Sequence, residues 1–204
     1  MPKISRVGAV NIEHGYFPVG ELWEPGFERK DHRLDLEARE PVIVVPGQIV
    51  VTSRVQEHAA PVVLAVVDRE NEAPGPSWTR VASVEYRPVY RGRMAALDTM
   101  NGPSGPAADG LEVFGQRADP GDPFVDLAPA QVYRAQVWSQ GRADSRERFD
   151  AATRREEGPA RDGFETYLIV FVPWGTQSPP LPAARASRRE HLVSKHGKPP
   201  LNMR

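Results

Sequence analysis

The chain has 204 residues, with 26 Lys and Arg against 27 Asp and Glu, so its formal net charge is -1. This balance argues against a strongly basic nucleic-acid-binding domain. The absence of cysteine excludes disulfide frameworks, thiol catalysis and cysteine-based zinc sites. The 21 prolines and 17 glycines interrupt the chain too often for long helices, while 40% hydrophobic residues suffice for one sizeable core.

The amino terminus lacks the continuous apolar core of a signal peptide, and no window approaches the run of roughly 18 apolar residues that a membrane span needs. We therefore expect a cytoplasmic protein that does not enter a membrane. The abundance of Arg, Ala, Pro, Val and Gly suggests a bacterial genome of high GC content.

Short β-type runs separated by Pro, Gly and Asp predict an all-β fold, an antiparallel sandwich of about seven to nine strands. The first run covers residues 7–19, with a bend expected at Gly15 or Pro18. The second covers residues 41–55, where the Pro-Gly pair at 46–47 predicts a turn or bulge between two short strands.

The middle of the chain continues this pattern. Residues 62–68 (VVLAVVD) are apolar almost throughout, which predicts a strand covered on both faces. Residues 78–90 alternate in polarity, and Pro88 marks this run as an edge or irregular strand. Residues 99–109 are small, polar and rich in Gly and Pro, which is typical of a loop, and residues 110–116 form a short strand.

Two clear strands close the domain. Residues 131–139 (QVYRAQVWS) alternate as a half-solvated antiparallel strand does, whereas residues 166–172 (TYLIVFV) are apolar on both faces and predict a central strand. Between them, residues 140–164 are dominated by Arg, Asp, Glu and Ala. We expect a mobile excursion there, with room for a helical turn or two within residues 145–157.

The chain divides into a sandwich domain at residues 1–175 and a Pro-containing tail at residues 176–204, which we expect to be disordered. The tail holds six basic residues and one Glu, so it carries about +5, and the body carries about -6. The near-neutral total therefore conceals an acidic domain with a basic extension. The tail basics are diluted and lack an aromatic stripe, which favours a solubilising role over nucleic-acid or membrane binding.

None of the five histidines has the spacing of a metal-binding motif, so we expect no metal site. His14 lies beside Glu13 and Tyr16, where it could form an acid-base group or simply be a half-buried, hydrogen-bonded histidine. No phosphate-binding glycine loop and no nucleophile elbow is present, which leaves phosphoryl and acyl transfer unsupported. We expect no cofactor.

Three aspartates lie in a turn-rich segment: Asp119, Asp122 and Asp126. Carboxylates in such a segment could gather around Ca²⁺, but their spacing matches no calcium loop. Asp beside Pro or Gly usually reflects turn chemistry, in which the side chain bonds to its own backbone, and this is the interpretation that we favour.

Aromatic residues offer a different kind of site. They could stack on a sugar or a base if one groove held them, but a division between core and rim is the commoner outcome for Trp23, Trp78, Trp138, Trp174, Tyr16, Phe17 and Phe27. Trp23 and Phe27 are set in a loop after the first strand, beside carboxylates. Such loop aromatics are typical interface anchors, so we predict that this stretch contacts a partner.

Five segments together resemble the competence nuclease-inhibitor (ComJ-like) proteins. The resemblance is carried by an amino-terminal strand, a middle apolar strand and a final hairpin with its lead-in, at residues 10–19 (VNIEHGYFPV), 61–68, 124–129 (FVDLAP), 133–139 (YRAQVWS) and 165–171 (ETYLIVF). It covers residues of roughly 5 to 174. It implies a small β-sandwich that binds and blocks a nuclease and catalyses nothing itself.

The charge of the body agrees with this implication, because an acidic surface can mimic nucleic acid in the cationic cleft of a nuclease. We therefore expect a protein partner, such as a nuclease or toxin, and no direct nucleic-acid binding by the folded domain. Together with the loop aromatics Trp23 and Phe27, the predicted contact residues are the acidic residues expected on loops, Glu21, Glu24, Glu28, Asp119 and Asp122.

Two other functions stay open at this point. The tryptophan and tyrosine content is compatible with a sandwich that binds carbohydrate or another small ligand. Scattered Asp, Glu and His side chains could also assemble an active site, in which case a cleft would have to bring two or more titratable groups together.

Overall fold

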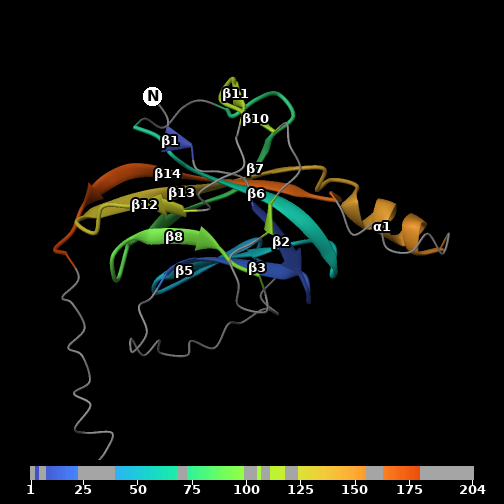
Figure 1. The fold of residues 1–204 in the computed structure, drawn as a ribbon, viewed down its shortest axis with the longest axis horizontal. Helices are drawn as coiled ribbons and strands as arrows, with labels where there is room; N and C mark the ends of the chain where they lie inside the picture. Colours follow the sequence, from blue (N-terminus) through green and yellow to red (C-terminus); the bar gives the residue numbers. More distant parts are fainter. Residues whose placement is uncertain are drawn as a thin grey trace, which may run out of the picture.

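Two β-sheets face each other in the computed structural model, which describes residues 3–4, 8–22, 40–68, 73–98, 105–106, 111–117, 124–154 and 163–179 (Figure 1). The larger sheet contains seven strands, which are, in order, β7 (Thr79–Tyr86), β13 (Gln131–Gln140), β14 (Thr166–Thr176), β6 (His58–Val66), β2 (Gly8–Ile12) and β9 (Gly105–Pro106), with β1 (Lys3–Ile4) beside β6. The smaller sheet contains five, β12 (Phe124–Asp126), β8 (Arg93–Ala96), β3 (Tyr16–Glu21), β5 (Gln48–Thr52) and β4 (Val42–Val45).

The predicted all-β sandwich is confirmed. Its strands outnumber the seven to nine expected, because several are only two to four residues long and leave little trace in the sequence pattern. Within the described residues every strand pair is antiparallel except β6 with β14. The prediction that 78–90 holds an edge strand is also confirmed, since β7 ends the larger sheet.

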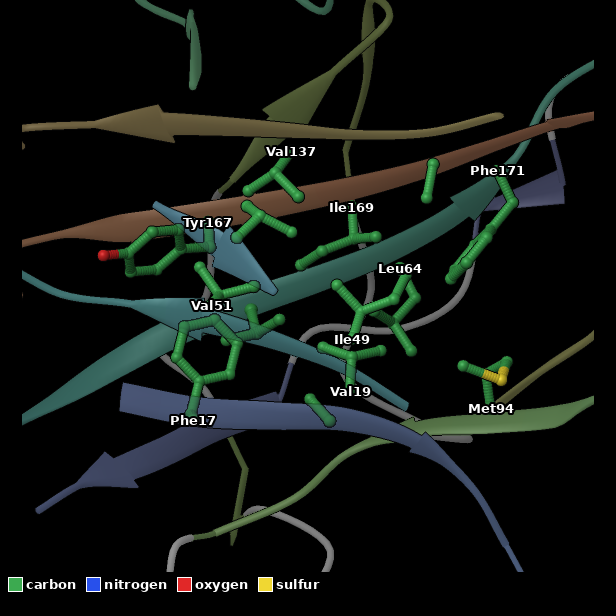
Figure 2. Close-up of a cluster of buried hydrophobic side chains, with 14 of the residues drawn as sticks. Phe17, Val19, Ile49, Val51, Leu64, Met94, Val137, Tyr167, Ile169 and Phe171 are labelled. Carbon is green, nitrogen blue, oxygen red and sulfur yellow. The ribbon is translucent and has the colours of Figure 1, made fainter. Parts of the chain in front are cut away.

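The main core lies between the two sheets. Figure 2 shows Phe17 and Val19 of β3 directed toward Tyr167 and Ile169 of β14, and all four side chains are fully buried. The rings of Phe17 and Tyr167 meet edge to face, with their centroids 5.0 Å apart. This packing joins two strands that are about 150 residues apart in the chain and holds the layers together.

A second apolar cluster covers the outer face of the larger sheet. There Leu168 and Val170 of β14 pack with Trp78 and Trp138, under the ribbon formed by β10 (Glu112–Val113) and β11 (Gln116–Arg117). Both central strands are therefore buried on their two faces, as their unbroken apolar runs predict. The expected division of the tryptophans between core and rim is seen for the three that the structure describes. Trp78 and Trp138 belong to this buried cluster, whereas Trp174 is exposed.

Two tight turns lie where the sequence places bends. His14 and Gly15 both adopt positive φ, 64° and 76°, and carry the chain from β2 in one sheet to β3 in the other. Gly47, with a φ of 75°, follows Pro46 in the turn between β4 and β5. The bend in the first run is thus at Gly15, since Pro18 lies inside β3.

The segment between β13 and β14 contains α1 (Ser145–Arg154), which is longer than the one or two turns expected. Hydrogen bonds tie this helix to the sheet in place of an apolar face. Arg148 Nη2 donates to the carbonyl oxygens of Gly141 at 2.7 Å and Phe164 at 2.6 Å, and the Phe149 ring contacts the Phe164 ring. The mobile excursion expected here is therefore, for residues 145–154, a helix anchored at one end of the sandwich.

Other expectations fall largely outside the described residues. Of the loop expected at 99–109, the described part is β9, which pairs with β2. The boundary expected after 175 lies near the end of β14 at Thr176, and Gln177 still bonds to neighbouring loops. Residues 180–204, most of the predicted tail, are outside the described part.

The packing between the sheets gives a first prediction. Replacing Ile169, which is fully buried, with Ala should lower the free energy of unfolding by about 2–5 kcal/mol, since it leaves a cavity between the sheets. Ile169→Val should cost only about 0.5–1.5 kcal/mol because it removes a single methylene. Urea denaturation followed by circular dichroism measures both, and equal costs for the two variants would contradict this packing.

Candidate interaction site

Trp174 is the most prominent apolar side chain on the described surface. It is 54% exposed. It sits in a β-bulge, because Tyr133 of β13 pairs with Pro173 and Val132 with Gly175, which leaves Trp174 without an opposite residue. A bulge re-aims the side chain that it carries. The bulge therefore explains why an indole at the end of a buried strand points to solvent.

An arginine covers one face of this indole. The guanidinium carbon of Arg134 lies 3.5 Å from the centroid of the Trp174 ring, a close cation–π contact. Arg134 is paired in register with Glu85 of β7, and Glu85 in turn forms an ion pair with Arg87 at 2.8 Å. The exposed indole thus belongs to an ordered row of surface side chains that carry positive and negative charges.

Two further arginine–aromatic pairs lie at the same end of the sandwich. Arg93 stands over the Phe124 ring at 4.4 Å, and Arg91 over the Tyr90 ring at 5.5 Å. We call this end of the sandwich the arginine–aromatic end, and it comprises Tyr90, Arg91, Arg93, Phe124, Arg134 and Trp174. By the alternation of the strands, Arg134 belongs to the outer face of the larger sheet, and Arg93 and Phe124 belong to the outer face of the smaller one. It lies where the red end of β14 is drawn in Figure 1, opposite α1.

Gln177 connects the loops of this end. Its Nε2 donates to the carbonyl oxygens of Pro88 at 3.1 Å and Pro129 at 3.0 Å, and its backbone N–H donates to the carbonyl of Ala130. One side chain therefore joins the β7–β8 loop, the β12–β13 loop and the end of β14. Loops held in this way present their side chains in a defined arrangement.

A buried carboxylate fixes the turn that carries Tyr90 and Arg91. Glu21 accepts hydrogen bonds from the backbone N–H groups of Val89 at 2.6 Å, Tyr90 at 2.8 Å and Gly92 at 3.0 Å. It also accepts one from the hydroxyl of Tyr86 at 3.1 Å. Burial raises the pKa of Tyr86, and the neighbouring Glu21 raises it further, so that the phenol stays protonated and can donate.

These contacts correct one expectation. Glu21 was predicted on an exposed loop, but it ends β3 and is 2% exposed, so its carboxylate is not a surface contact group. The apolar pattern of the first strand does not reveal this, because the donors come from a turn about 70 residues later. Glu21 acts instead on the arginine–aromatic end from inside.

The other six predicted contact residues lie outside the described residues: Trp23, Glu24, Phe27, Glu28, Asp119 and Asp122. Their described neighbours, however, are close together. Leu22, which precedes Trp23, donates its N–H to the carbonyl of Arg93 at 2.8 Å, and Phe124, just after Asp122, lies under the Arg93 guanidinium. Both segments therefore join the sandwich at the arginine–aromatic end.

The distribution of charge supports this grouping. The described residues contain 12 Lys and Arg and 13 Asp and Glu, so they are almost neutral. Most of the acidic surplus of the body thus belongs to segments outside the described residues, among them the two that join the sandwich at Leu22 and Phe124.

Sequence reasoning does not single out Trp174 from the other three tryptophans. Its exposure depends on the bulge, which is a property of the pairing between β13 and β14 and not of the local pattern. The polar position of Arg134 on its strand was visible in the alternation, but its stacking partner was not.

At the opposite end of the sandwich, a polar cluster surrounds Glu165, which is fully buried. Its carboxylate accepts hydrogen bonds from Ser53 Oγ at 2.8 Å, Ser145 Oγ at 2.6 Å, the N–H of Arg54 at 3.2 Å and the Tyr167 hydroxyl. Burial, together with this carboxylate, raises the pKa of Tyr167. The cluster ties together the β5–β6 loop, the start of α1 and β14.

His58 completes this cluster but does not make it a catalytic triad. Its Nε2 lies 3.1 Å from Ser53 Oγ, while the carboxylate of Glu165 bonds to the serine directly. In a triad the carboxylate orients the histidine, which then activates the serine. Here the histidine is buried and the serine hydroxyl is shared, an arrangement that stabilises the loop.

A shallow cavity of about 400 Å³ lies beside the first turn and is lined by Glu13, His14, Gln56 and Glu57. The structure thus brings His14 and Glu13 together, as one sequence hypothesis requires, but Tyr16 does not line the cavity. Within the described residues, no group of three His, Asp or Glu side chains has the arrangement of a metal site.

The described residues also bear on the hypothesis that aromatic side chains bind a carbohydrate. Trp78, Trp138 and Phe17 are buried, so they cannot form a stacking platform for a sugar. Among the helices that the structure describes, none combines the length and apolar character of a membrane crossing.

Comparison with solved structures gives two distant matches. One is the crystal structure of ComJ, inhibitor of the DNA-degrading activity of NucA, from Bacillus subtilis. It is 11% identical, with a TM-score of 0.47, and the match covers 85% of this chain and 99% of that one. The other is described as crocagin biosynthetic gene J, 10% identical with a TM-score of 0.43, with 85% and 98% covered.

No protein-family model and no curated protein sequence matches the chain. The distant likeness to ComJ is in line with the resemblance to ComJ-like proteins seen in the sequence. At this similarity no residue of either structure assigns a role to a residue here.

The buried position of Glu21 gives a second prediction. Glu21→Gln should lower the free energy of unfolding by about 2–3 kcal/mol, because the amide is a weaker acceptor and its NH₂ group faces backbone donors. The control is Glu85→Gln, whose side chain is 52% exposed; it should change stability by less than about 0.5 kcal/mol. Urea titrations compare the two, and similar costs would show that the Glu21 hydrogen bonds contribute little.

His58 gives a prediction of pH dependence. Burial lowers its pKa below the ordinary value of 6.5, and Glu165 only partly offsets this. The unfolded chain therefore binds a proton at a higher pH than the folded one, so stability is complete above about pH 6.5 and is lost as the pH falls toward the folded-state pKa. Unfolding measured at pH 7.5, 6.5 and 5.5 should show this loss, and His58→Gln should reduce it.

The control for that experiment is His14→Gln, because His14 is exposed on the first turn. It should leave the pH dependence of wild type unchanged. If His58→Gln and wild type lost stability in parallel between pH 6.5 and 5.5, another group would be responsible.

Proposed function

We propose that the chain is a non-catalytic β-sandwich that binds another protein through the arginine–aromatic end, and that this partner is a nuclease or nuclease-type toxin whose activity it blocks. The observation that carries the proposal is Trp174, half exposed on a bulge and stacked by Arg134. Tryptophan and arginine are among the residues most enriched at the energetic centres of protein interfaces.

The rigidity of this surface supports binding. Gln177 and Glu21 hold the loops that carry Tyr90, Arg91 and Arg93. A surface that is ordered before binding loses less conformational entropy when it meets its partner, which raises affinity. Carboxylates such as Glu85 and Asp126 alternate with the arginines, a mixture that suits a protein surface better than a polyanion.

A nuclease as partner is supported by carboxylates in the two segments that join this end. Glu24, Glu28, Asp119 and Asp122 follow Leu22 or precede Phe124 in the chain. Carboxylates presented there can compete with phosphates for a cationic nuclease cleft. The sequence resemblance to nuclease inhibitors carried by residues 10–19 and 133–139 points to the same class.

The test is an inhibition assay with purified nucleases encoded next to the gene for this chain. The wild-type protein should slow DNA degradation by its partner, and Trp174→Ala and Arg134→Ala should each weaken inhibition by about 30-fold, which corresponds to about 2 kcal/mol. Glu147→Gln, an exposed substitution on α1 far from the site, is the control and should inhibit like wild type.

The binding step can be measured independently by gel filtration of the mixture. A complex that forms equally well with Trp174→Ala would move the interface elsewhere on the sandwich. Failure of every candidate nuclease either to be inhibited or to form a complex would contradict the proposed partner.

A further inference from the structure

The end of β14 carries Trp174 with few restraints from the sheet. β6 accompanies β14 only as far as Phe171, and from Pro173 onward β13 is its one neighbour among the described strands. Pro173 has no N–H group to donate, and Trp174 has no opposite residue at the bulge. A strand end with so little hydrogen bonding opens more easily than the strands of the core.

The side chains of this stretch add one anchor. From Pro173 to Pro179, all of the residues are exposed except Gln177, which is half-buried. Its amide group has two N–H donors, and each of them meets a carbonyl oxygen, that of Pro88 at 3.1 Å and that of Pro129 at 3.0 Å. The strand end that holds the indole is therefore fastened to two loops through a single side chain.

One of these loops is the turn that Glu21 fixes. Pro88 directly precedes Val89 and Tyr90, whose N–H groups donate to the buried carboxylate of Glu21. The carbonyl that accepts from Gln177 is thus part of an ordered turn and not of a free loop. Through it, the end of β14 is tied to the same group that holds the other half of the arginine–aromatic end.

We propose that Gln177 is the positioning residue of the arginine–aromatic end: by joining the end of β14 to the β7–β8 turn, it keeps Trp174 stacked on Arg134 and fixed relative to Tyr90 and Arg91. Without this side chain, the strand end populates conformations in which the stack is open. The placement of the indole is a property of the protein alone, whereas its consequence for a partner rests on the proposed function.

That consequence follows from populations. A partner that requires the stacked indole binds only the fraction of molecules in which the stack is formed, so its apparent affinity falls in proportion to that fraction. Gln177 contributes in this way without touching the partner itself. Its effect on binding should therefore disappear once the Trp174 indole has been removed.

Nuclear magnetic resonance of the free full-length protein tests the placement. The ring current of Trp174 should shift the Arg134 side-chain protons upfield, because the guanidinium lies 3.5 Å from the ring centroid, and Trp174→Ala should abolish this shift. Gln177→Ala should lose most of the shift. Gln177→Glu has nearly the same shape but no N–H donor, so it should lose the shift as well.

The neighbouring residue supplies the matched control. Ser178→Ala changes an exposed side chain next to Gln177 and should keep the wild-type shift of Arg134. The indole N–H signals of the buried Trp78 and Trp138 report on the rest of the sandwich, and they should stay unchanged in both Gln177 variants. Wild-type Arg134 shifts in Gln177→Ala would overturn the proposal, and so would a change that extends to Trp78 and Trp138.

A double-mutant cycle in the inhibition assay tests the consequence for binding. Gln177→Ala should weaken inhibition by about tenfold in the wild-type background and should have little further effect in Trp174→Ala, because both act through the same indole. Equal effects in the two backgrounds would show that Gln177 does not act through Trp174. If no nuclease is inhibited even by wild type, the proposed function fails, and the Arg134 shifts still decide the role of Gln177.

Discussion

Two buried carboxylates determine the arrangement of both ends of this sandwich. Glu21 collects backbone donors from the β7–β8 turn, and Glu165 collects donors from the β5–β6 loop and the start of α1. A carboxylate removed from water costs several kcal/mol unless hydrogen bonds replace its hydration. The loops that supply these bonds are therefore held in place by residues far away in the chain.

Because these carboxylates must be hydrogen-bonded, the irregular segments that supply the donors form surfaces of fixed shape. Strand pairing within the smaller sheet places β3 between β5 and β8, and Glu21 then orders the turn that presents Tyr90 and Arg91. Trp174 depends on a different device, the bulge opposite Tyr133 and Val132. The arginine–aromatic end is thus assembled from strand ends, a turn and a bulge, none of which contains the whole site.

Much of the fold was predictable because its signals are local. The unbroken apolar runs at 62–68 and 166–172 indicated the central strands, and the glycines at 15 and 47 marked the turns. The candidate site was harder to predict from the sequence. Glu21 was predicted on the surface, and the helix at 145–154 was expected to be shorter, because its anchoring by Arg148 and Phe149 uses contacts with distant residues.

The sequence by itself determined the class of the fold, the identity of its central strands and the separation of an acidic body from a basic tail, since periodicity, turn residues and charge are properties of neighbouring residues. Only the tertiary structure decided which glutamates are buried and which tryptophan is exposed. These depend on the register between strands and on donors that the fold brings together from segments as much as 112 residues apart, and no local pattern encodes such distances.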